Sequence, residues 1–456
     1  MNSTGKFSAF LLAGVQSGSG KTTLTLALLA ALARRGLTAA PFKCGPDYID
    51  GIFHRQISGR DSGNLDAFLL GDGGVARSFA AGCQGADAAV VEGVMGLFDG
   101  YEPGKLAGSS AEIAATLDLP VILTVNARGL SGSIAPLVRG FVRWRPEVRV
   151  TGVIADFVGS DRHAEILRQA LEEAGDVPLL GAFRRNDALT LPERHLGLAT
   201  ESDCSRLVRQ LAEQAEQDLD IDRLLRLTER PRPRTAATPD AAFSGKVRLG
   251  VARDEAFQFY YADNLRMLEA SGAETVPFSP LRDAALPDGL DGLYLGGGFP
   301  ELHAEALAAN RAMKQSIRDF AARGRPVYGE CGGYLYLLEK LTDRHGRSFD
   351  FTGLLPGTAR MTPRLAGLGY RELVTARESF FGPAGTRLRG HEFHYSVTEL
   401  PPGQEALFHA ADLRGRTIPM CGGSCRGQVA GSYAHIHFAS APRALRNFVE
   451  ALKIHE

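Results

Sequence analysis

Two short segments of this sequence combine residue types and spacings that could do chemistry. The first is the run GVQSGSGKTT at residues 14–23, which follows an apolar stretch at residues 7–12 and precedes a helical pattern at residues 24–34. In a strand–loop–helix unit, such glycines let the backbone wrap closely around a phosphate chain, and the N–H groups at the start of the helix point at it. The residues that we expect to bind a nucleotide are Gly14, Ser17, Gly18, Ser19, Gly20, Lys21, Thr22 and Thr23.

Two side chains of this loop have expected roles of their own. Lys21 would reach the β- and γ-phosphates, and the Thr22 hydroxyl would bind Mg²⁺. Five residues separate Gly14 from Gly20, one more than in the common pattern, and this spacing is similar to that of dethiobiotin synthetase and its relatives. A glycine–serine turn without a ligand is the alternative, which the Lys-Thr-Thr sequence disfavours.

Acidic residues follow two further apolar strands in this half of the chain. Asp47 and Asp50 lie in a turn rich in glycine and proline, and Glu92 comes directly after the apolar run AAVV. Because ligands bind at the carboxyl ends of parallel strands, we expect Asp47 and Glu92 to join Thr22 at Mg²⁺. We assign Asp50 and Asp99 to substrate contacts, although Asp99 could touch the metal as well. Ordinary turn chemistry is the alternative for Asp47 and Asp50.

The second reactive segment is GECGG at residues 329–333. An apolar strand at residues 326–328 precedes it, and a helical pattern at residues 334–341 follows it. This strand–G-x-C-x-G–helix order is the thiol version of a nucleophile elbow, in which the glycines permit the sharp turn that presents the side chain. The start of a helix also favours the thiolate form of a cysteine. We therefore expect Cys331 to be a nucleophile rather than a buried structural cysteine.

A cysteine nucleophile needs a base and a group that stabilises an oxyanion. Gly297 and Gly298 belong to a glycine triplet at the end of a strand, so their N–H groups are candidates for the oxyanion site. The candidate base is His435 in the segment SYAHIHF, because a histidine near the C-terminus, after the cysteine, is typical of a glutaminase.

Two other clusters could bind a metal instead. His391 and His394 form a His-x-x-His pair beside an acidic residue, and Cys421 and Cys425 form a C-x-x-x-C pair. Neither comes with further soft ligands at zinc spacing, so a structural metal is the weaker interpretation of both.

Two sheets are needed to position the reactive segments. Apolar strands and helical patterns alternate in the N-terminal half and recur in the C-terminal half, which is typical of doubly wound α/β sheets. The run ERPRPRTAATP that starts at residue 229 contains three prolines and breaks every pattern. We therefore predict a P-loop ATP-binding domain at residues 1–228, a linker at residues 229–245 and a glutaminase domain at residues 246–456.

Other polar residues in the first domain indicate a function less specifically. Asn126 and Asp156 end two of its strands, where a nucleotide base could be read. A polar cluster between apolar flanks consists of Glu193, Arg194 and His195. These side chains either bind an anion or pair with one another, and we favour pairing.

The composition excludes several classes of protein. The chain has 456 residues, of which 44% are hydrophobic and 23% are charged, and its net charge is −1. This balance provides no basic surface for nucleic acid, and no apolar run reaches the roughly 18 residues of a membrane span. The apolar stretch near the start runs into the phosphate loop and does not read as a signal peptide. Six cysteines in so long a chain make no disulfide framework, so we expect a cytoplasmic protein.

Together, these motifs resemble the cobyrinate a,c-diamide synthase family over nearly the full length of the chain. The segment GHEFHYS at residues 390–396 is similar to this family rather than to cobyric acid synthase. The resemblance implies an N-terminal P-loop domain like that of dethiobiotin synthetase and a C-terminal domain like class I glutamine amidotransferases. The segments that carry it are residues 15–23, 43–50, 91–100, 193–198, 251–261, 295–301, 329–333, 390–396 and 432–438.

The resemblance also implies a reaction. Cys331, assisted by His435, would split glutamine through a thioester and release ammonia. In the N-terminal domain a carboxylate of cobyrinate would attack ATP and become an acyl phosphate, which ammonia converts to an amide, while Lys21 and Mg²⁺ offset the phosphate charge. In the family this happens on the a and c side chains during cobalamin biosynthesis. The implied partners are cobyrinate, glutamine (or ammonia) and ATP, all small molecules.

Two positions depart from related proteins. Glutaminases with a full triad carry Glu two residues after the histidine, where this chain, like its family, has His437. Asp156 stands where related P-loop ligases commonly have Asn. Three alternatives stay open: hydrogenobyrinate or a sirohydrochlorin-type ring as substrate, a regulatory P-loop ATPase with an inactive amidotransferase domain, and a zinc-binding interaction module. The oligomeric state is open too, a homodimer included.

Overall fold

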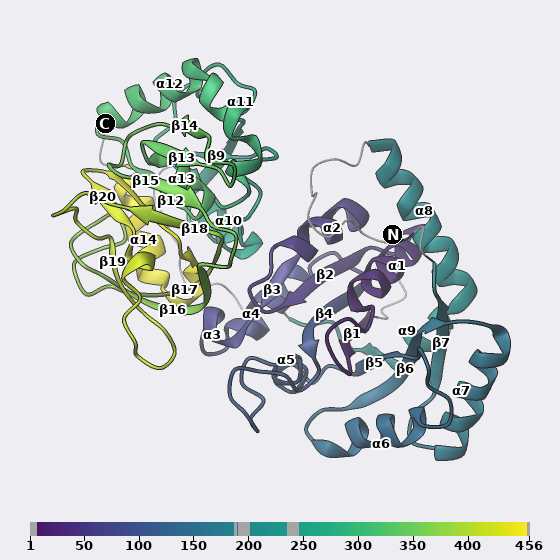
Figure 1. Cartoon of the computed structure of the whole chain (residues 1–456). Helices are drawn as coiled ribbons and strands as arrows, with labels where there is room; N and C mark the ends of the chain where they lie inside the picture. The colour runs from purple at the N-terminus through teal and green to yellow at the C-terminus, as the bar shows by residue number, and fades with distance from the viewer. Residues whose placement is uncertain (1–6, 187–188, 190–200, 235–245, 454–456) are drawn as a thin grey trace. The chain divides into compact units, whose positions relative to one another are not determined.

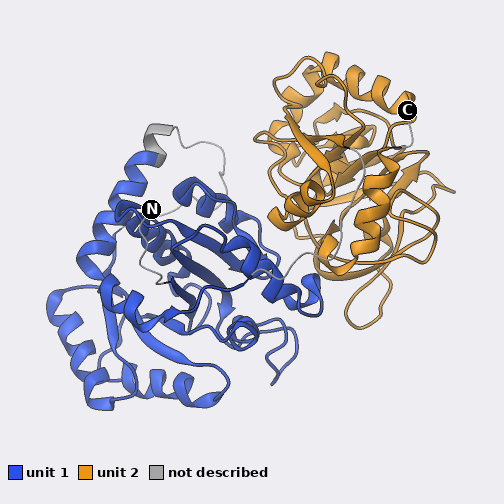
Figure 2. Cartoon of the chain, turned by 180° about the vertical axis from the view of Figure 1, so that it is seen from behind, with its two compact units in different colours: residues 1–237 blue, residues 238–456 orange. Residues whose placement is uncertain are grey.

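The computed structural model describes residues 7–186, 189, 201–234 and 246–453. The chain divides into two compact units, Met1–Ala237 and Thr238–Glu456. Figure 1 shows the helices and strands of each unit, and Figure 2 distinguishes the units by colour. In the described residues, no helix is both long and apolar enough to cross a membrane.

A largely parallel sheet forms the centre of the first unit. Its strand order is β3-β2-β4-β1-β5-β6-β7, and the short β8 pairs antiparallel with the start of β1. All of β1 is buried, as its uninterrupted apolar sequence predicts for a parallel strand that is covered on both faces. The strands are β1 (Phe7–Gly14), β2 (Ala39–Cys44), β3 (Gly63–Leu65), β4 (Ala88–Gly96), β5 (Val121–Asn126), β6 (Val150–Val158), β7 (Leu179–Arg184) and β8 (Glu229–Arg230).

Helices pack against this sheet and complete its core. Helix α1 is rich in leucine and alanine, buried along most of its length, and shares one apolar core with residues of α8 and α9. The helices are α1 (Lys21–Arg34), α2 (Ile49–Ser58), α3 (Ala67–Leu70), α4 (Gly74–Gly82), α5 (Ser110–Leu117), α6 (Ile134–Trp144), α7 (Asp161–Ala174), α8 (Glu201–Asp218) and α9 (Ile221–Leu227).

The first residues of the predicted linker belong to this unit. Glu229 and Arg230 pair with β1 as strand β8. The Arg232 guanidinium lies over the Phe7 ring, 5.0 Å from its centroid. The linker therefore begins later than predicted, because backbone pairing and a cation–π contact hold its proposed start against the sheet. The rest of it, residues 235–245, lies outside the described residues.

The second unit is built on a six-stranded sheet in the order β10-β9-β11-β12-β21-β20. Its strands run parallel except for β20, which is antiparallel at one edge. Two four-stranded sheets, β14-β13-β15-β18 and β19-β16-β17-β22, accompany it. The strands are β9 (Val247–Ala252), β10 (Ala273–Phe278), β11 (Gly292–Leu295), β12 (Val327–Glu330), β13 (Lys340–Thr342), β14 (Ser348–Asp350), β15 (Thr358–Met361), β16 (Gly367–Thr375), β17 (Arg387–His394), β18 (Ser396–Glu399), β19 (Phe408–Ala411), β20 (Ser424–Arg426), β21 (Val429–Ser432) and β22 (His435–Ile436).

The helices of this unit are fewer and include short 3₁₀ turns. They are α10 (Ala262–Ala270), α11 (Ala304–Ala309), α12 (Arg311–Ala322), α13 (Gly332–Leu337) and α14 (Pro442–Ala451), with 3₁₀ turns η2 (Pro300–His303), η3 (Pro419–Gly422) and η4 (Phe438–Ser440).

Both sheets place a reactive segment at the carboxyl end of a central strand. The phosphate loop follows β1, which lies between β4 and β5, and Cys331 follows β12, which lies between β11 and β21. Helix α13 is shorter than the pattern over residues 334–341 predicts, because the chain turns at Leu338 and enters β13.

Candidate active sites

The phosphate loop joins β1 to α1. Gly18 and Gly20 have φ angles of 73° and 74°, a left-handed conformation that glycine adopts without strain. At Gly20 the fit is also tight, because a Cβ there would lie 1.6 Å from Oδ2 of Asp156. The Lys21 ammonium donates to the Gln16 carbonyl at 3.3 Å, so it lies over the loop backbone.

The other predicted nucleotide-binding residues lie on the same loop. The Ser19 hydroxyl donates to the Gln16 carbonyl at 2.8 Å and closes the turn. A Cβ at Gly14 would lie 2.8 Å from the same carbonyl, so this position too requires glycine. Ser17 is exposed at the tip, and Thr23 is half-buried in the first turn of α1. The local sequence pattern therefore predicted a loop that the structure contains.

Alanine substitutions at two glycines should separate backbone strain from steric contact. Gly18→Ala places a side chain at positive φ with nothing within 4 Å, so we expect it to cost about 1–2 kcal/mol of unfolding free energy. Gly20→Ala has nearly the same φ and also pushes against the buried Asp156, which should add about 1–3 kcal/mol. Chemical denaturation of both variants without nucleotide measures the difference. Equal losses would contradict the tight fit at Gly20.

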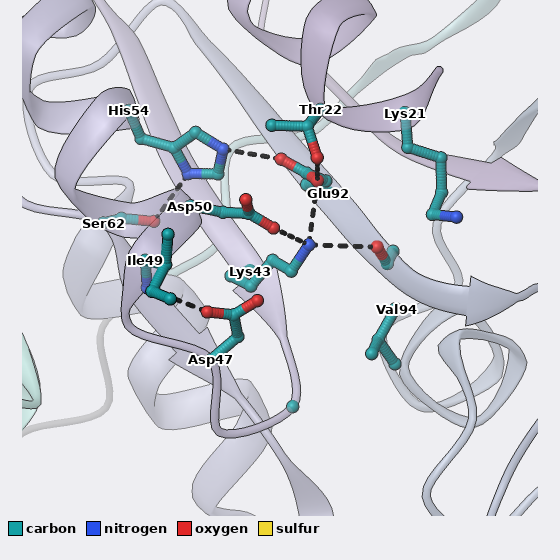
Figure 3. Close-up of polar contacts among 12 residues, drawn as sticks. Lys21, Thr22, Lys43, Asp47, Ile49, Asp50, His54, Ser62, Glu92 and Val94 are labelled. Carbon is teal, nitrogen blue, oxygen red and sulfur yellow. Dashed lines mark hydrogen bonds and ion pairs between the residues drawn. The ribbon is translucent and has the colours of Figure 1, made fainter. Parts of the chain in front are cut away.

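A buried carboxylate, Glu92, organises the residues beside this loop (Figure 3). Its Oε1 accepts hydrogen bonds from Thr22 Oγ1 at 2.6 Å and from Lys43 Nζ at 2.8 Å. Its Oε2 lies 2.8 Å from His54 Nε2, and His54 Nδ1 lies 2.9 Å from the Ser62 hydroxyl. Strand β2 and helices α1 and α2 thus each contribute one side chain to the contacts of Glu92, which lies on β4.

Opposite charges hold this cluster together. Burial would raise the pKa of Glu92, but the adjacent Lys43 and His54 hold it well below its usual range. Burial also disfavours the Lys43 cation, yet Glu92 and Asp50 together raise its pKa above the usual value. Lys43 forms a second ion pair with Asp50. Burial and the charge of Glu92 raise the pKa of Asp50 to about 7. Two carboxylates therefore compete for one ammonium group, and Asp50 is the weaker acid of the two.

Thr22 and Glu92, two of the expected Mg²⁺ ligands, are in direct contact through a hydrogen bond of 2.6 Å, and Lys43 and His54 also bind the Glu92 carboxylate. Mg²⁺ takes few protein ligands because water and phosphate oxygens complete its shell, so the Mg²⁺ site at Thr22 and Glu92 stays a prediction. Asp47 makes a different contact. Its carboxylate accepts a hydrogen bond from the Ile49 N–H at 2.8 Å, and Figure 3 shows it turned toward Ile49. In this structure the side chain stabilises the turn that leads into α2, and its assignment as a metal ligand stays a prediction.

The predicted substrate contacts lie at the same edge of the sheet. Asp50 is part of the Lys43 ion pair, at the start of α2. Asp99 is exposed in the loop after β4, where its carboxylate accepts from the Gly96 N–H at 2.9 Å. Its charge is close enough to Lys21 to act on that residue's pKa, which burial and Lys43 lower. Among the described residues, no three His, Cys, Asp or Glu side chains are arranged to hold a metal ion.

Our reading of the sequence missed Lys43 and His54. Lys43 belongs to a segment that we singled out for its acids, and a lysine at a strand end beside two acids is the signal that could have found it. His54 gave no comparable signal, because its contact with Glu92 depends on how α2 packs on the sheet.

The positions proposed to read the base are neighbours. Asn126 and Asp156 are paired in register at the ends of β5 and β6. The Asn126 side chain accepts from the Arg128 N–H at 3.0 Å, and burial raises the pKa of Asp156 to about 6. The polar cluster at residues 193–195 lies outside the described residues.

Cys331 forms a sharp turn between β12 and α13. Its φ of 47° and ψ of −103° are rare for a residue with a side chain, and such strain is typical of a nucleophile elbow. Its N–H donates to the Ser432 carbonyl at 2.8 Å, and its Sγ lies 3.9 Å from the Phe393 carbonyl. A Cβ at Gly333 would lie 2.0 Å from the Leu295 carbonyl oxygen, so α13 can approach β11 only through a glycine.

The predicted base lies beside this thiol. His435 is buried on β22, and burial disfavours its charged form. Hydrogen bonds and charge interactions with Cys331 and Glu330 outweigh burial and raise the pKa of His435 to about 9. Its Nδ1 lies 3.6 Å from Glu330 Oε2. The structure thus brings the predicted nucleophile and base together and adds a carboxylate that the sequence pattern did not identify.

The glycine triplet lies at the same site, but one of its two predicted donors is engaged. The Gly297 N–H donates to the Phe259 carbonyl at 3.2 Å, so it is not available to an oxyanion in this structure. Gly298 approaches the elbow more closely, because a Cβ at Gly332 would lie 3.0 Å from the Gly298 nitrogen. The structure therefore favours Gly298 over Gly297 as an oxyanion donor.

Comparison with known proteins identifies the family. Residues 10–198 match the CobQ/CobB/MinD/ParA nucleotide binding domain, and residues 248–443 match the CobB/CobQ-like glutamine amidotransferase domain. Cobyrinate a,c-diamide synthase of Syntrophotalea carbinolica is 46% identical over 448 residues, which cover 96% of this chain and 97% of that protein. The Synechocystis enzyme of the same name is 44% identical over 96% of this chain and 92% of its own length. The chain belongs to the cobyrinate a,c-diamide synthase family.

Membership in the cobyrinate a,c-diamide synthase family confirms the predicted architecture. The phosphate loop and the thiol elbow lie in two α/β domains, one nucleotide-binding and one of the glutamine amidotransferase type. The chain is thus a glutamine-dependent amidating ligase with a domain for ATP.

The zinc alternative for the GHEFHYS segment is wrong. His391 and His394 lie three residues apart on β17, so their side chains point to opposite faces of the strand. Both ring nitrogens of His394 are engaged, one 2.7 Å from Glu392 and the other 2.7 Å from the Ser396 carbonyl. Glu392 also forms a buried ion pair with Arg371. In this family member the segment is an internal hydrogen-bonded network beside Cys331.

Proposed function

We propose that this protein amidates the a- and c-side-chain carboxylates of cobyrinate, with ATP as the energy source and glutamine or ammonia as the nitrogen source. The observation that carries the proposal is that one chain holds both half-sites: Cys331 with His435 on one sheet, and Lys21 with the Glu92 cluster on the other. Relatives at 44–46% identity over nearly the whole chain are named for this product, which supports the choice of ring.

In the amidotransferase domain, the Cys331 thiolate attacks the side-chain amide carbon of glutamine. The carbon–nitrogen bond breaks, the His435 imidazolium gives its proton to the departing ammonia, and a thioester remains until water hydrolyses it. The strained elbow presents the sulfur, and a pKa of about 9 keeps His435 charged for this proton transfer near neutral pH. We assign the oxyanion to the N–H groups of Gly298 and Gly332, whose backbones meet at the elbow.

In the P-loop domain, the substrate carboxylate attacks the γ-phosphate of ATP, and ammonia then displaces phosphate from the acyl phosphate. The loop N–H groups and Lys21 bind the phosphates, and Thr22 and Glu92 would hold Mg²⁺, which offsets phosphate charge when bound. We propose that Asp50 and Asp99 contact the substrate, since both lie at the edge where the phosphate loop opens. Lys43 keeps Asp50 and Glu92 in place through its two ion pairs.

We further propose that the enzyme acts in the cytoplasm on small molecules and does not bind nucleic acid. For its oligomeric state, we propose a homodimer as the form to test. A net charge of −1 provides no basic field for nucleic acid.

An amidation assay with three rings tests the substrate. Purified protein receives ATP, glutamine and either cobyrinate, hydrogenobyrinate or a sirohydrochlorin, and products are identified by mass. We expect cobyrinate to gain two amides. Conversion of only one of the other rings would contradict the assigned substrate while keeping the mechanism. ATP hydrolysis without conversion of any ring would instead favour a regulatory ATPase.

A further inference from the structure

Glu330, the residue directly before the nucleophile, is a buried carboxylate whose position is fixed from several sides. It ends β12 and is 1% exposed. Its Oε2 accepts from the Tyr294 hydroxyl at 2.9 Å. Its Oε1 accepts from the Tyr328 hydroxyl at 3.1 Å and from the Ile436 N–H at 3.2 Å. These three donors are neutral, so they orient the carboxylate without compensating its charge.

The cationic partner of this carboxylate is the base of the glutaminase site. Among the described residues, the group within 4.0 Å of Glu330 that can carry a positive charge is His435, whose Nδ1 lies 3.6 Å from Oε2. A buried carboxylate without a cation is costly, so the geometry favours a charged His435. Because Nδ1 faces Glu330, the opposite ring nitrogen is left for the Cys331 thiol.

The position that carries the orienting acid in glutaminases with a full triad cannot serve here. His437 occupies it, and its Nδ1 accepts from the Ala439 N–H at 3.2 Å. Its Nε2 lies 4.0 Å from Asp263 on α10. Burial lowers the pKa of His437 to about 4, so the ring is neutral at physiological pH. A neutral imidazole cannot replace a carboxylate as the anion that orients a second histidine.

We propose that Glu330 is the positioning carboxylate of this glutaminase, supplied from the residue before the nucleophile instead of from the strand that carries the base. It holds the His435 ring with Nδ1 toward itself and stabilises the imidazolium that donates a proton to ammonia. This inference rests on the proposed glutaminase reaction and adds a residue to it.

Glu330 should also influence the pH dependence of glutamine hydrolysis. The titratable groups that face His435 are Glu330 on β12, Cys331 at the elbow and His391, its register partner on β17. Burial lowers the pKa of His391 to about 3, so it stays neutral and does not titrate near neutral pH. The raised pKa of His435 therefore depends on Glu330 and Cys331, and loss of the Glu330 charge should lower it. The alkaline limit of glutamine hydrolysis should then move to lower pH.

Glu330→Gln tests this with little change of shape, since its amide oxygen can still accept from the Ile436 N–H. We expect kcat for glutamine hydrolysis to fall about 100-fold with KM within about twofold, and the alkaline limb of kcat to move down in pH. Synthesis from free ammonia should be unchanged, and unchanged thermal unfolding of the variant shows that the unit that carries Glu330 is folded. A parallel profile of Cys331 alkylation by iodoacetamide reports the same shift without any ring substrate.

Two hydroxyl deletions form a matched pair around the same carboxylate. Tyr294→Phe removes the donor on Oε2, the oxygen that faces His435, and Tyr328→Phe removes the donor on Oε1. We expect the larger shift of the alkaline limb for Tyr294→Phe. This pair keeps the proposal testable if Glu330→Gln does not fold.

Two results would overturn the assignment. Glu330→Gln with wild-type kcat would show that His435 needs no carboxylate. Loss of activity with an unmoved alkaline limb in both the kinetic and the alkylation profiles would show that Glu330 is structural. A wild-type protein that does not split glutamine at all would contradict the proposed function itself, which is a different outcome.

Discussion

Cys331→Ala should abolish amidation from glutamine and leave amidation from ammonia intact. The thiol forms the covalent bond to glutamine, and the alanine variant keeps the Cβ and hence the strained elbow, but loses the nucleophile. The phosphate loop and the Glu92 cluster lie in the other compact unit and are not touched. Initial rates with saturating glutamine and with ammonium chloride, each with ATP and ring substrate, measure the two activities. We expect the glutamine rate to fall at least about 10³-fold and the ammonia rate to stay within about twofold.

Cys425→Ala is the matched control for this variant. Its sulfur lies 3.8 Å from the carbonyls of Glu405 and Ala406 and has no role in the proposed chemistry. Both activities should survive in it. Loss of both activities in Cys331→Ala would contradict the division of the reaction between two sites.

Lys21→Ala should stop amidation from both nitrogen sources. Its ammonium lies over the phosphate loop, where we expect it to offset charge on the transferring phosphate, whichever source supplies the ammonia. Loss of one such preorganised charge typically costs about 10²–10³-fold in rate. The same two assays, with glutamine and with ammonium chloride, measure it.

The fold should tolerate this change, because the Lys21 ammonium makes one hydrogen bond with the described residues, to the Gln16 carbonyl. Unchanged thermal unfolding without nucleotide is the check. A Lys21→Ala variant that amidates from ammonia at the wild-type rate would remove the P-loop domain from the chemistry.

The strands that carry the reactive segments were predictable because they are buried on both faces. β1 and β12 read as short uninterrupted apolar runs that end in glycine-rich turns, and no distant partner is needed to recognise them. The two small sheets of the second unit were not predicted. β14 and β20 have three residues each, and β17 pairs with β16 and with the distant β22, so their local sequences hold little information on their partners.

The residues of the two candidate active sites also divide into those that the local sequence predicts and those that depend on distant contacts. Thr22, Glu92, Cys331 and His435 stand at the ends of apolar strands or in a rare motif, and the structure places Thr22 beside Glu92 in one unit and Cys331 beside His435 in the other. The roles of the other site residues depend on contacts between elements that are distant in the sequence. Lys43 pairs with both Asp50 and Glu92, and Glu330 contacts His435 from another strand. The role of Asp47 could not be settled from the sequence, because an acid that caps a turn and an acid that binds a metal have the same local sequence.

One isotope experiment tests the central claim, that a thiol site delivers ammonia to a carboxylate activated by ATP. The protein receives glutamine with ¹⁵N in its amide and cobyrinate with ¹⁸O in its carboxylates, and mass spectrometry follows the ring and the released phosphate. We predict one ¹⁵N in each new amide and one ¹⁸O in each phosphate, because the acyl phosphate leaves with a carboxylate oxygen. Amide without ¹⁵N would contradict glutamine as the donor, and phosphate without ¹⁸O would contradict the acyl phosphate.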